Sequence, residues 1–222
     1  MIDVHFWPTP NGWKVTILLE ETGLPYRLVP VDLGAGAQLS PEFLSISPNG
    51  RMPAIVDPDG PGGQPIAIFE SGAILQYLAD KAGAFYPSER RVRSAVEQWL
   101  YWQCAGLGPM VGQAGHFNYL SEKIPYALER YTAESRRLYG VLDRHLAGRE
   151  FVADDYSIAD MAIWPWIRGY KMLGVDLKEF PSLRAWFRRV GAREAVVRGA
   201  DIGKAEFALQ QNARLQRSGA QA

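Results

Sequence analysis

Two patterns of apolar and polar positions divide the chain near residue 83. In the first part, short apolar runs alternate with segments whose apolar residues have helical spacing. The apolar runs predict four strands, at Ile2–Phe6, Tyr26–Asp32, Ala54–Asp57 and Ile66–Phe69. The helical spacing predicts helices at Asn11–Glu21, Pro41–Ile46 and Ser71–Lys81. The expected element order is therefore βαβαββα.

This order predicts a mixed four-stranded sheet. A strand–helix–strand unit joins parallel neighbours through a right-handed crossover. The third and fourth strands are separated by Pro58–Pro65, which is rich in Pro and Gly and is typical of an antiparallel hairpin. We therefore expect an α/β domain at residues 1–82, followed by a linker at 83–88.

Helical spacing continues through the rest of the chain. Long amphipathic helices are predicted around residues 92–111 and 124–146, and Pro181 begins another. Ser157 and Asp160 have the spacing of a capping box before the apolar run Met161–Ile167. The pattern predicts an all-α domain at residues 89–210 and a flexible, polar tail at 211–222.

Composition narrows the class of protein. Of 222 residues, 47% are hydrophobic and 22% are charged, which is typical of a globular protein. Lys plus Arg and Asp plus Glu both number 24, so no basic excess favours nucleic-acid binding as the main activity. The lone cysteine, Cys104, excludes an intrachain disulfide, a CxxC pair and a cysteine-rich zinc site. The three histidines lack metal-ligand spacing, so we expect no metal.

No segment has the pattern of a targeting signal or a membrane span. The first residues lack the basic and long apolar regions of a signal peptide. The apolar run Met161–Ile167 contains Pro165 and is too short to cross a bilayer. We expect a cytoplasmic protein that does not bind membranes.

Three segments of the first domain offer groups that can hold a ligand, and the first is Pro8-Thr9-Pro10-Asn11-Gly12. It joins the first strand to the first helix, where a hydroxyl and an amide stand beside free helix N–H groups. That arrangement can hold an anion. The alternative is an ordinary turn with Asn11 as the N-cap.

The second segment surrounds Met52 and Pro53. Proline directly before a central strand is unusual, because it removes a donor from the hydrogen-bond ladder. A cis peptide bond between Met52 and Pro53 would make a tight turn and leave the main chain of Met52 free to pair with a ligand peptide. The alternative is a trans proline that begins the strand.

The third segment is Glu70-Ser71, where Ser71 can cap the next helix and Glu70 lies just outside it. A carboxylate, a hydroxyl and helix N–H groups suit a ligand that carries both an ammonium and a carboxylate group. The alternative is a simple helix cap with a favourable acidic neighbour. We expect all three segments to lie at the same edge of the sheet.

With these motifs in place, the chain resembles the glutathione transferases, whose thioredoxin-like N-terminal domain precedes an all-helical domain. The resemblance extends from Ile2 to about Gly199 and includes Met52-Pro53, Glu70-Ser71 and the capping box at Ser157–Asp160. Finer motifs, including Thr9-Pro10-Asn11-Gly12 and Ile124–Tyr131, resemble the bacterial Nu class. Members of that class are glutathione-dependent disulfide-bond reductases.

The resemblance implies a set of site residues. Thr9 and Asn11 would be catalytic, because no tyrosine, serine or cysteine of the other classes follows the first strand. Glutathione, reduced or oxidised, would be the cosubstrate, and the second substrate would be a small disulfide or electrophile. The resemblance also implies a homodimer. The residues implied to bind glutathione are Asn11, Gln38, Met52, Pro53, Glu70, Ser71 and Arg130.

With one cysteine in the chain, the sulfur atoms for disulfide exchange must come from the ligand. One glutathione thiolate would attack a disulfide and a second would resolve the mixed disulfide. Two alternatives use the same residues: a transferase that adds the thiol to an electrophile, and a regulator that binds glutathione without catalysis. We expect Cys104 to be a packing residue.

Overall fold

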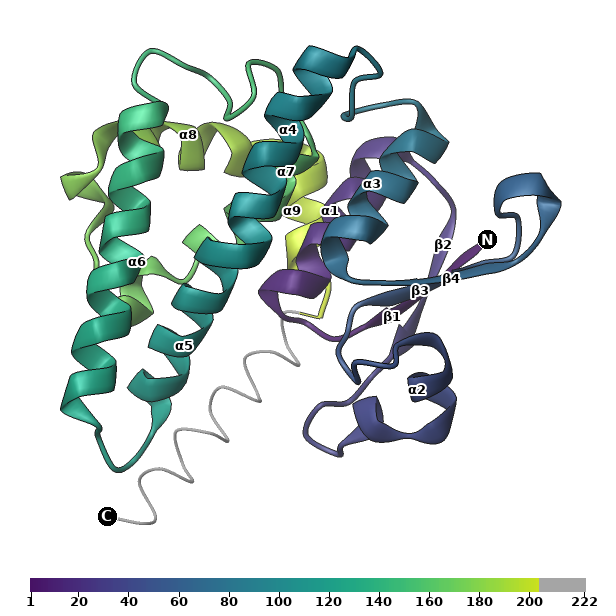
Figure 1. Cartoon of the computed structure of the whole chain (residues 1–222), viewed down its shortest axis with the longest axis horizontal. Helices are drawn as coiled ribbons and strands as arrows, with labels where there is room; N and C mark the ends of the chain where they lie inside the picture. Colours follow the sequence, from purple (N-terminus) through teal and green to yellow (C-terminus); the bar gives the residue numbers. More distant parts are fainter. Residues whose placement is uncertain (204–222) are drawn as a thin grey trace. The chain divides into compact units, whose positions relative to one another are not determined.

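The computed structural model describes residues 1–203, which form two compact units. The first unit contains residues 1–86 together with 194–203, and the second contains residues 87–193. Figure 1 shows the whole chain coloured along the sequence. The predicted tail at 211–222, and residues 204–210 of the predicted helical domain, lie outside the described residues.

The first unit is built on a sheet with the strand order β2-β1-β3-β4. Strands β1 and β2 are parallel, whereas β3 is antiparallel to both β1 and β4. The predicted mixed four-stranded sheet is therefore confirmed. The strands are β1 (Ile2–Phe6), β2 (Tyr26–Pro30), β3 (Ala54–Asp57) and β4 (Ile66–Phe69), so the second strand ends two residues earlier than expected.

Helices cover both faces of this sheet. Figure 1 shows α1 and α3 on one face and α2 on the other. Residues 12–19 of α1 are all buried, and within the first unit the helix contacts α3 and α9 (Glu194–Asp201). The helices are α1 (Pro10–Thr22), α2 (Pro41–Ile46) and α3 (Ser71–Ala82), and short 3₁₀ turns lie at Ala37–Leu39 and Pro61–Gly63.

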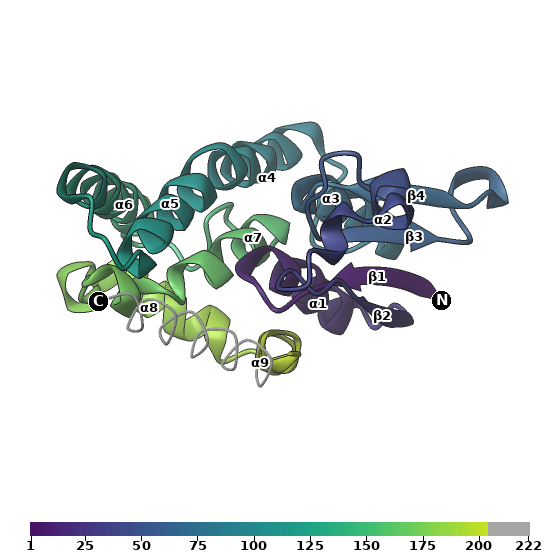
Figure 2. The same ribbon diagram turned by 90° about the horizontal axis from the view of Figure 1, so that it is seen from below.

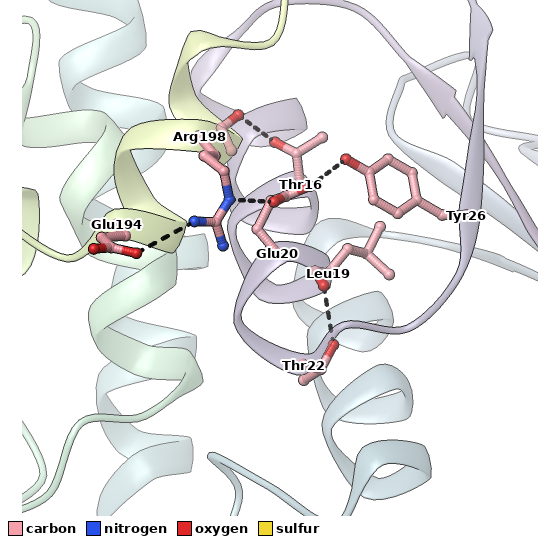
Figure 3. Close-up of polar contacts among 8 residues, drawn as sticks. Thr16, Leu19, Glu20, Thr22, Tyr26, Glu194 and Arg198 are labelled. Atoms are coloured by element: carbon pink, nitrogen blue, oxygen red, sulfur yellow. Dashed lines mark hydrogen bonds and ion pairs between the residues drawn. The ribbon is translucent and has the colours of Figure 1, made fainter.

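Helix α9 (Glu194–Asp201) completes the first unit by packing against α1. The two helices meet at Gly199, whose carbonyl oxygen accepts a hydrogen bond of 2.8 Å from Thr16 Oγ1 (Figure 3). Beside this contact, Arg198 Nε donates to Glu20 Oε2 at 2.8 Å, and the Tyr26 hydroxyl donates to Glu20 Oε1 at 2.8 Å. The Arg198 guanidinium holds the pKa of the Glu20 carboxyl below its usual range.

The place of α9 bears on the predicted division of the chain. The boundaries predicted from the sequence assigned residues 89–210 to one helical domain. In the structure, residues 194–203 are grouped with the first unit. The end of the first domain at residue 82 and the start of the helical domain at residue 89 remain predictions.

The described part of the second unit is helical. The predicted helix around residues 92–111 is interrupted by a π-helical turn at Gln103–Leu107. Helices α5 and α6 lie side by side (Figures 1 and 2). Two 3₁₀ turns lie at Tyr170–Leu173 and Leu177–Glu179. The helices are α4 (Arg90–Trp102), α5 (Gly108–Tyr119), α6 (Pro125–His145), α7 (Ile158–Ile167) and α8 (Pro181–Gly191).

A buried carboxylate organises the core of this unit. The predicted capping box at the start of α7 is present, with Ser157 and Asp160 exchanging hydrogen bonds. Asp160 also accepts from Val152 N at 3.1 Å and from Trp186 Nε1 at 2.8 Å, so it ties α7 to α8 and to the preceding loop. Burial raises the pKa of Asp160 to about 6, although these donors act in the opposite direction.

None of the helices within residues 1–203 combines the length and the apolar character that a membrane span requires.

Candidate functional site

The turn between β1 and α1 places Thr9 at the N-cap of α1. Its extended backbone, with φ −135° and ψ 163°, lets Oγ1 accept from Gly12 N at 3.3 Å. The expectation that Asn11 is the N-cap is therefore wrong. Pro10 occupies the first helical position, which its fixed φ favours, so the cap falls on the residue before it. Asn11 lies in the first turn of α1 and is half-buried.

The Thr9 hydroxyl also contacts the second predicted segment, 43 residues along the chain. Thr9 Oγ1 donates to Met52 Sδ at 3.4 Å. A thioether is a weak acceptor. A stronger acceptor at this position, such as an anion, would therefore replace Met52 Sδ as the acceptor of the Thr9 hydrogen bond at little cost in free energy.

The Met52–Pro53 peptide bond is cis, as predicted. Met52 is buried in a small cluster with Val31, Phe43 and Ala54, and the side chain of Trp7 packs against that cluster. Gly12 makes this packing possible. A Cβ at position 12 would lie 2.4 Å from Trp7 O and 3.0 Å from Met52 Cε, so only glycine lets α1 begin this close to the turn.

The third predicted segment lies at the start of helix α3, and the N-cap of that helix differs from the prediction. Ser71 is the first residue of the helix, and Glu70 occupies the N-cap with φ 71° and ψ 118°. A positive φ is uncommon for a residue with a Cβ, and such strained residues cluster at functional sites. Glu70 is exposed, whereas Ser71 is buried.

Ser71 has a partner that sequence patterns did not identify. The side chain of Lys14 in α1 is only 1% exposed, and its Nζ donates to Ser71 Oγ at 3.1 Å. The signal in the sequence was a single lysine inside the apolar stretch Trp13–Leu19 of a helix. Its partner is 57 residues away, so spacing alone did not reveal the pair.

Strand pairing brings the three segments to one edge of the sheet, as predicted. His5 near the end of β1 lies opposite Ala54, and Ala54 lies opposite Phe69 in β4. The residues that follow β1, precede β3 and follow β4 therefore emerge at the same edge. These residues are Trp7–Thr9, Met52-Pro53 and Glu70-Ser71.

Gln38 lies close to this edge, in the 3₁₀ turn before α2. Its main-chain oxygen approaches Gly50, because a Cβ at Gly50 would lie 3.3 Å from it. Its side-chain Oε1 is buried and has no hydrogen-bond partner within residues 1–203. The turn therefore holds an unused acceptor near the loop that leads to Met52.

Arg130 and Cys104 belong to the second unit. Arg130 is exposed on α6 and lines a hollow of about 690 Å³ together with Met110, Tyr126, Glu134 and Arg137. Its contact with a ligand stays a prediction. Cys104 lies in the π-helical turn, half-buried, with Sγ 3.6 Å from Gln103 Oε1. Within residues 1–203, no three His, Cys, Asp or Glu side chains are grouped so that they could hold a metal ion.

Two sequence models of one family match the two parts of the chain. The model described as glutathione S-transferase, N-terminal domain, matches residues 1–80, and the C-terminal domain model matches residues 125–189. The chain belongs to the glutathione S-transferase family. The fold class predicted from the sequence, a thioredoxin-like domain with a mixed sheet followed by helices, is that of the glutathione S-transferases and is confirmed.

A named relative and two solved structures are similar to the chain over most of its length. The chain is 52% identical over 198 residues to the disulfide-bond oxidoreductase YfcG of Escherichia coli, covering 88% of this chain and 92% of YfcG. A glutathione transferase from Pseudomonas putida, with one glutathione disulfide bound per subunit, has a TM-score of 0.86 and 44% identity, covering 90% of this chain and 91% of that one. A family member from Pseudomonas fluorescens, with two glutathione bound, has a TM-score of 0.85 and 47% identity, covering 90% and 92%.

Proposed function

We propose that this glutathione S-transferase is a glutathione-dependent disulfide-bond reductase, in which bound glutathione supplies the reacting thiols. The observation that carries the proposal is the turn at Thr9. A hydroxyl and a helix N-terminus meet beside the Met52–Pro53 turn, in a chain whose sequence contains one cysteine. The name of YfcG and the ligands of the two Pseudomonas structures support the same reading of the site.

The residues at the sheet edge suit the parts of glutathione. Glu70 would meet the ammonium of the γ-glutamyl group, and Ser71 with the first amides of α3 would meet its carboxylate. The main chain of Met52 would pair with the cysteinyl unit, as an added strand does. The buried Oε1 of Gln38 would accept from a ligand N–H, and Arg130 would bind a glutathione carboxylate.

The chemistry follows from the placement of the thiol. Thr9 Oγ1, the amide of Asn11 and the start of α1 would stabilise a thiolate, which is the species that attacks a disulfide. The thiolate forms a bond to one sulfur of the substrate, and the other sulfur leaves as a thiolate that takes a proton. A second glutathione thiolate then attacks the glutathione sulfur of the mixed disulfide. The products are two substrate thiols and one glutathione disulfide.

We also propose the setting in which this reaction takes place. The cytoplasm keeps glutathione largely in its thiol form, so a reductase that uses glutathione as its electron donor belongs there. The protein would act as a homodimer, without nucleic acid and without a membrane.

Two assays on the purified protein test the proposal. Reduction of 2-hydroxyethyl disulfide by glutathione, followed through the glutathione disulfide that forms, should be fast. Conjugation of glutathione to 1-chloro-2,4-dinitrobenzene should be slow, because no tyrosine, serine or cysteine follows β1 at Trp7-Pro8-Thr9. Fast conjugation without disulfide reduction would favour the transferase instead. Glutathione binding with neither activity would favour a regulator.

A further inference from the structure

Lys14 carries an ammonium group into the interior of the first unit. Its side chain is 1% exposed, and it lies on a helix whose residues 12–19 are all buried. Burying an ammonium costs several kcal/mol unless polar groups compensate for the lost water. The hydrogen bond from Lys14 Nζ to Ser71 Oγ is part of what compensates the ammonium for its lost water.

The contact with Ser71 fixes the direction of the serine hydroxyl. An ammonium has three donors and no acceptor, so along the 3.1 Å contact Ser71 Oγ must accept from Lys14 Nζ. A serine hydroxyl has one proton, and that proton must then point away from Lys14. Lys14 thus makes Ser71 a donor toward any other group that approaches it.

The groups around Ser71 indicate what that donor would meet. Ser71 is the first residue of α3, where the helix leaves amide N–H groups unpaired. A carboxylate placed there would accept from the amides and from the Ser71 hydroxyl, whose oxygen lies 3.1 Å from the Lys14 ammonium. The exposed carboxyl of Glu70 next to it would meet an ammonium group on the same ligand.

We propose that Lys14 is a positioning residue for the amino-acid end of glutathione: it orients the Ser71 hydroxyl as a donor and strengthens its hold on the γ-glutamyl α-carboxylate. This inference rests on the proposed function, because it takes glutathione as the ligand. It adds a residue that touches no ligand atom and acts through Ser71.

The test combines a double-mutant cycle with a change in the ligand. Lys14→Met keeps the length of the side chain and removes the charge, and Ser71→Ala removes the hydroxyl. Calorimetry would measure the Kd of glutathione and of an analogue whose γ-glutamyl α-carboxylate is a carboxamide. Lys178→Met, at an exposed lysine of the second unit, is the control for loss of a positive charge.

We expect Lys14→Met to weaken glutathione binding about tenfold, because a hydrogen bond to a charged group has about that effect or more on an equilibrium constant. The KM for glutathione should rise more than kcat falls. Binding of the carboxamide analogue should change less than threefold, and Lys14→Met should have little effect in the Ser71→Ala background. Lys178→Met should bind both ligands as the wild type does.

Three results would overturn the inference. Equal weakening of both ligands would make Lys14 a purely structural residue, and an undiminished effect in the Ser71→Ala background would show that it does not act through Ser71. An unchanged Kd in a folded Lys14→Met protein would also refute it, and Lys14→Gln makes the same comparison if Lys14→Met does not fold. Failure of the wild type to bind glutathione is a different outcome, because it refutes the proposed function and this inference together.

Discussion

Gly199 is the position where a single methyl group should separate α9 from α1. A Cβ built on Gly199 would lie 2.7 Å from both Ile17 Cα and Ile17 N, and 2.9 Å from Thr16 C. These are backbone atoms of a buried helix, so they cannot rotate away as the end of a side chain can. The Gly199→Ala change therefore forces the two helices apart by several tenths of an ångström.

The expected cost follows from three terms. Overpacking of this kind costs about 1–3 kcal/mol, and separation of the helices weakens the hydrogen bond from Thr16 Oγ1 to Gly199 O, worth about 1 kcal/mol. Alanine recovers up to about 1 kcal/mol of helix propensity. The net loss is about 1–3 kcal/mol in the free energy of unfolding. For a protein of this size, that corresponds to a melting temperature lower by roughly 2–12 °C.

Thermal melts followed by circular dichroism would measure this loss, and Gly140→Ala in α6 is the matched control. A Cβ at Gly140 would meet first the tip of Arg144, at 3.3 Å, which is a flexible side chain. Gly140→Ala should therefore leave the melting temperature unchanged or raise it. If Gly199→Ala melts at or above the temperature of the wild type, the close approach of α9 to α1 is not a constraint on the fold.

Three further predictions concern the site, the core and the assembly. Asn11→Ala should slow disulfide reduction roughly a hundredfold, because one lost donor to an anion costs about 3 kcal/mol, and Thr9→Ala should slow it less. Cys104→Ala should retain activity and lose about 1 kcal/mol of stability. If rate assays show that Cys104→Ala abolishes reduction while Thr9→Ala and Asn11→Ala leave it intact, the protein uses its own thiol. Burial raises the pKa of Asp160 to about 6, so between about pH 4 and 6 the folded state binds more protons than the unfolded state. The contribution of Asp160 to the free energy of unfolding should therefore fall by at most about 3 kcal/mol as pH rises through this range. Urea titrations at pH 4.5 and 7.5 should show the gap between wild type and Asp160→Asn narrowing at the higher pH, and a constant gap would contradict the shift. Light scattering at micromolar concentration should give twice the 24.8 kDa mass of one chain, and the mass of a single chain would argue against the dimer.

Local patterns predicted most of the first unit because its strands and helices are short and separated by Pro and Gly. The alternation at Ile2–Phe6 and the Pro/Gly-rich hairpin before Ile66 predicted the sheet that the structure shows. The caps were harder to predict, because neighbouring residues compete for them. Thr9 took the cap expected at Asn11, and Glu70 took the one expected at Ser71.

Contacts between distant segments could not be predicted from spacing. The spacing of apolar residues in α9 does not show that this helix contacts α1. The hydrogen bond between the two helices joins Thr16 to Gly199, which are 183 residues apart in the sequence. The pairing of Lys14 with Ser71 is hidden for the same reason. The π-helical turn at Gln103–Leu107 lies within a run of continuous helical spacing, so a single sequence does not distinguish it from α-helix.

The grouping of α9 with the first unit has a consequence for how the protein is made. The first unit is discontinuous in sequence, since residues 1–86 are completed by residues 194–203. At a synthesis rate of about 5–20 residues per second, the ribosome needs roughly 5–25 s to reach Gly203 after it has made Tyr86. During that interval the newly made segment lacks the helix that covers Thr16 and Glu20. We therefore expect a nascent chain arrested before residue 194 to be cleaved by protease within α1, and the full chain released from the ribosome to resist cleavage there.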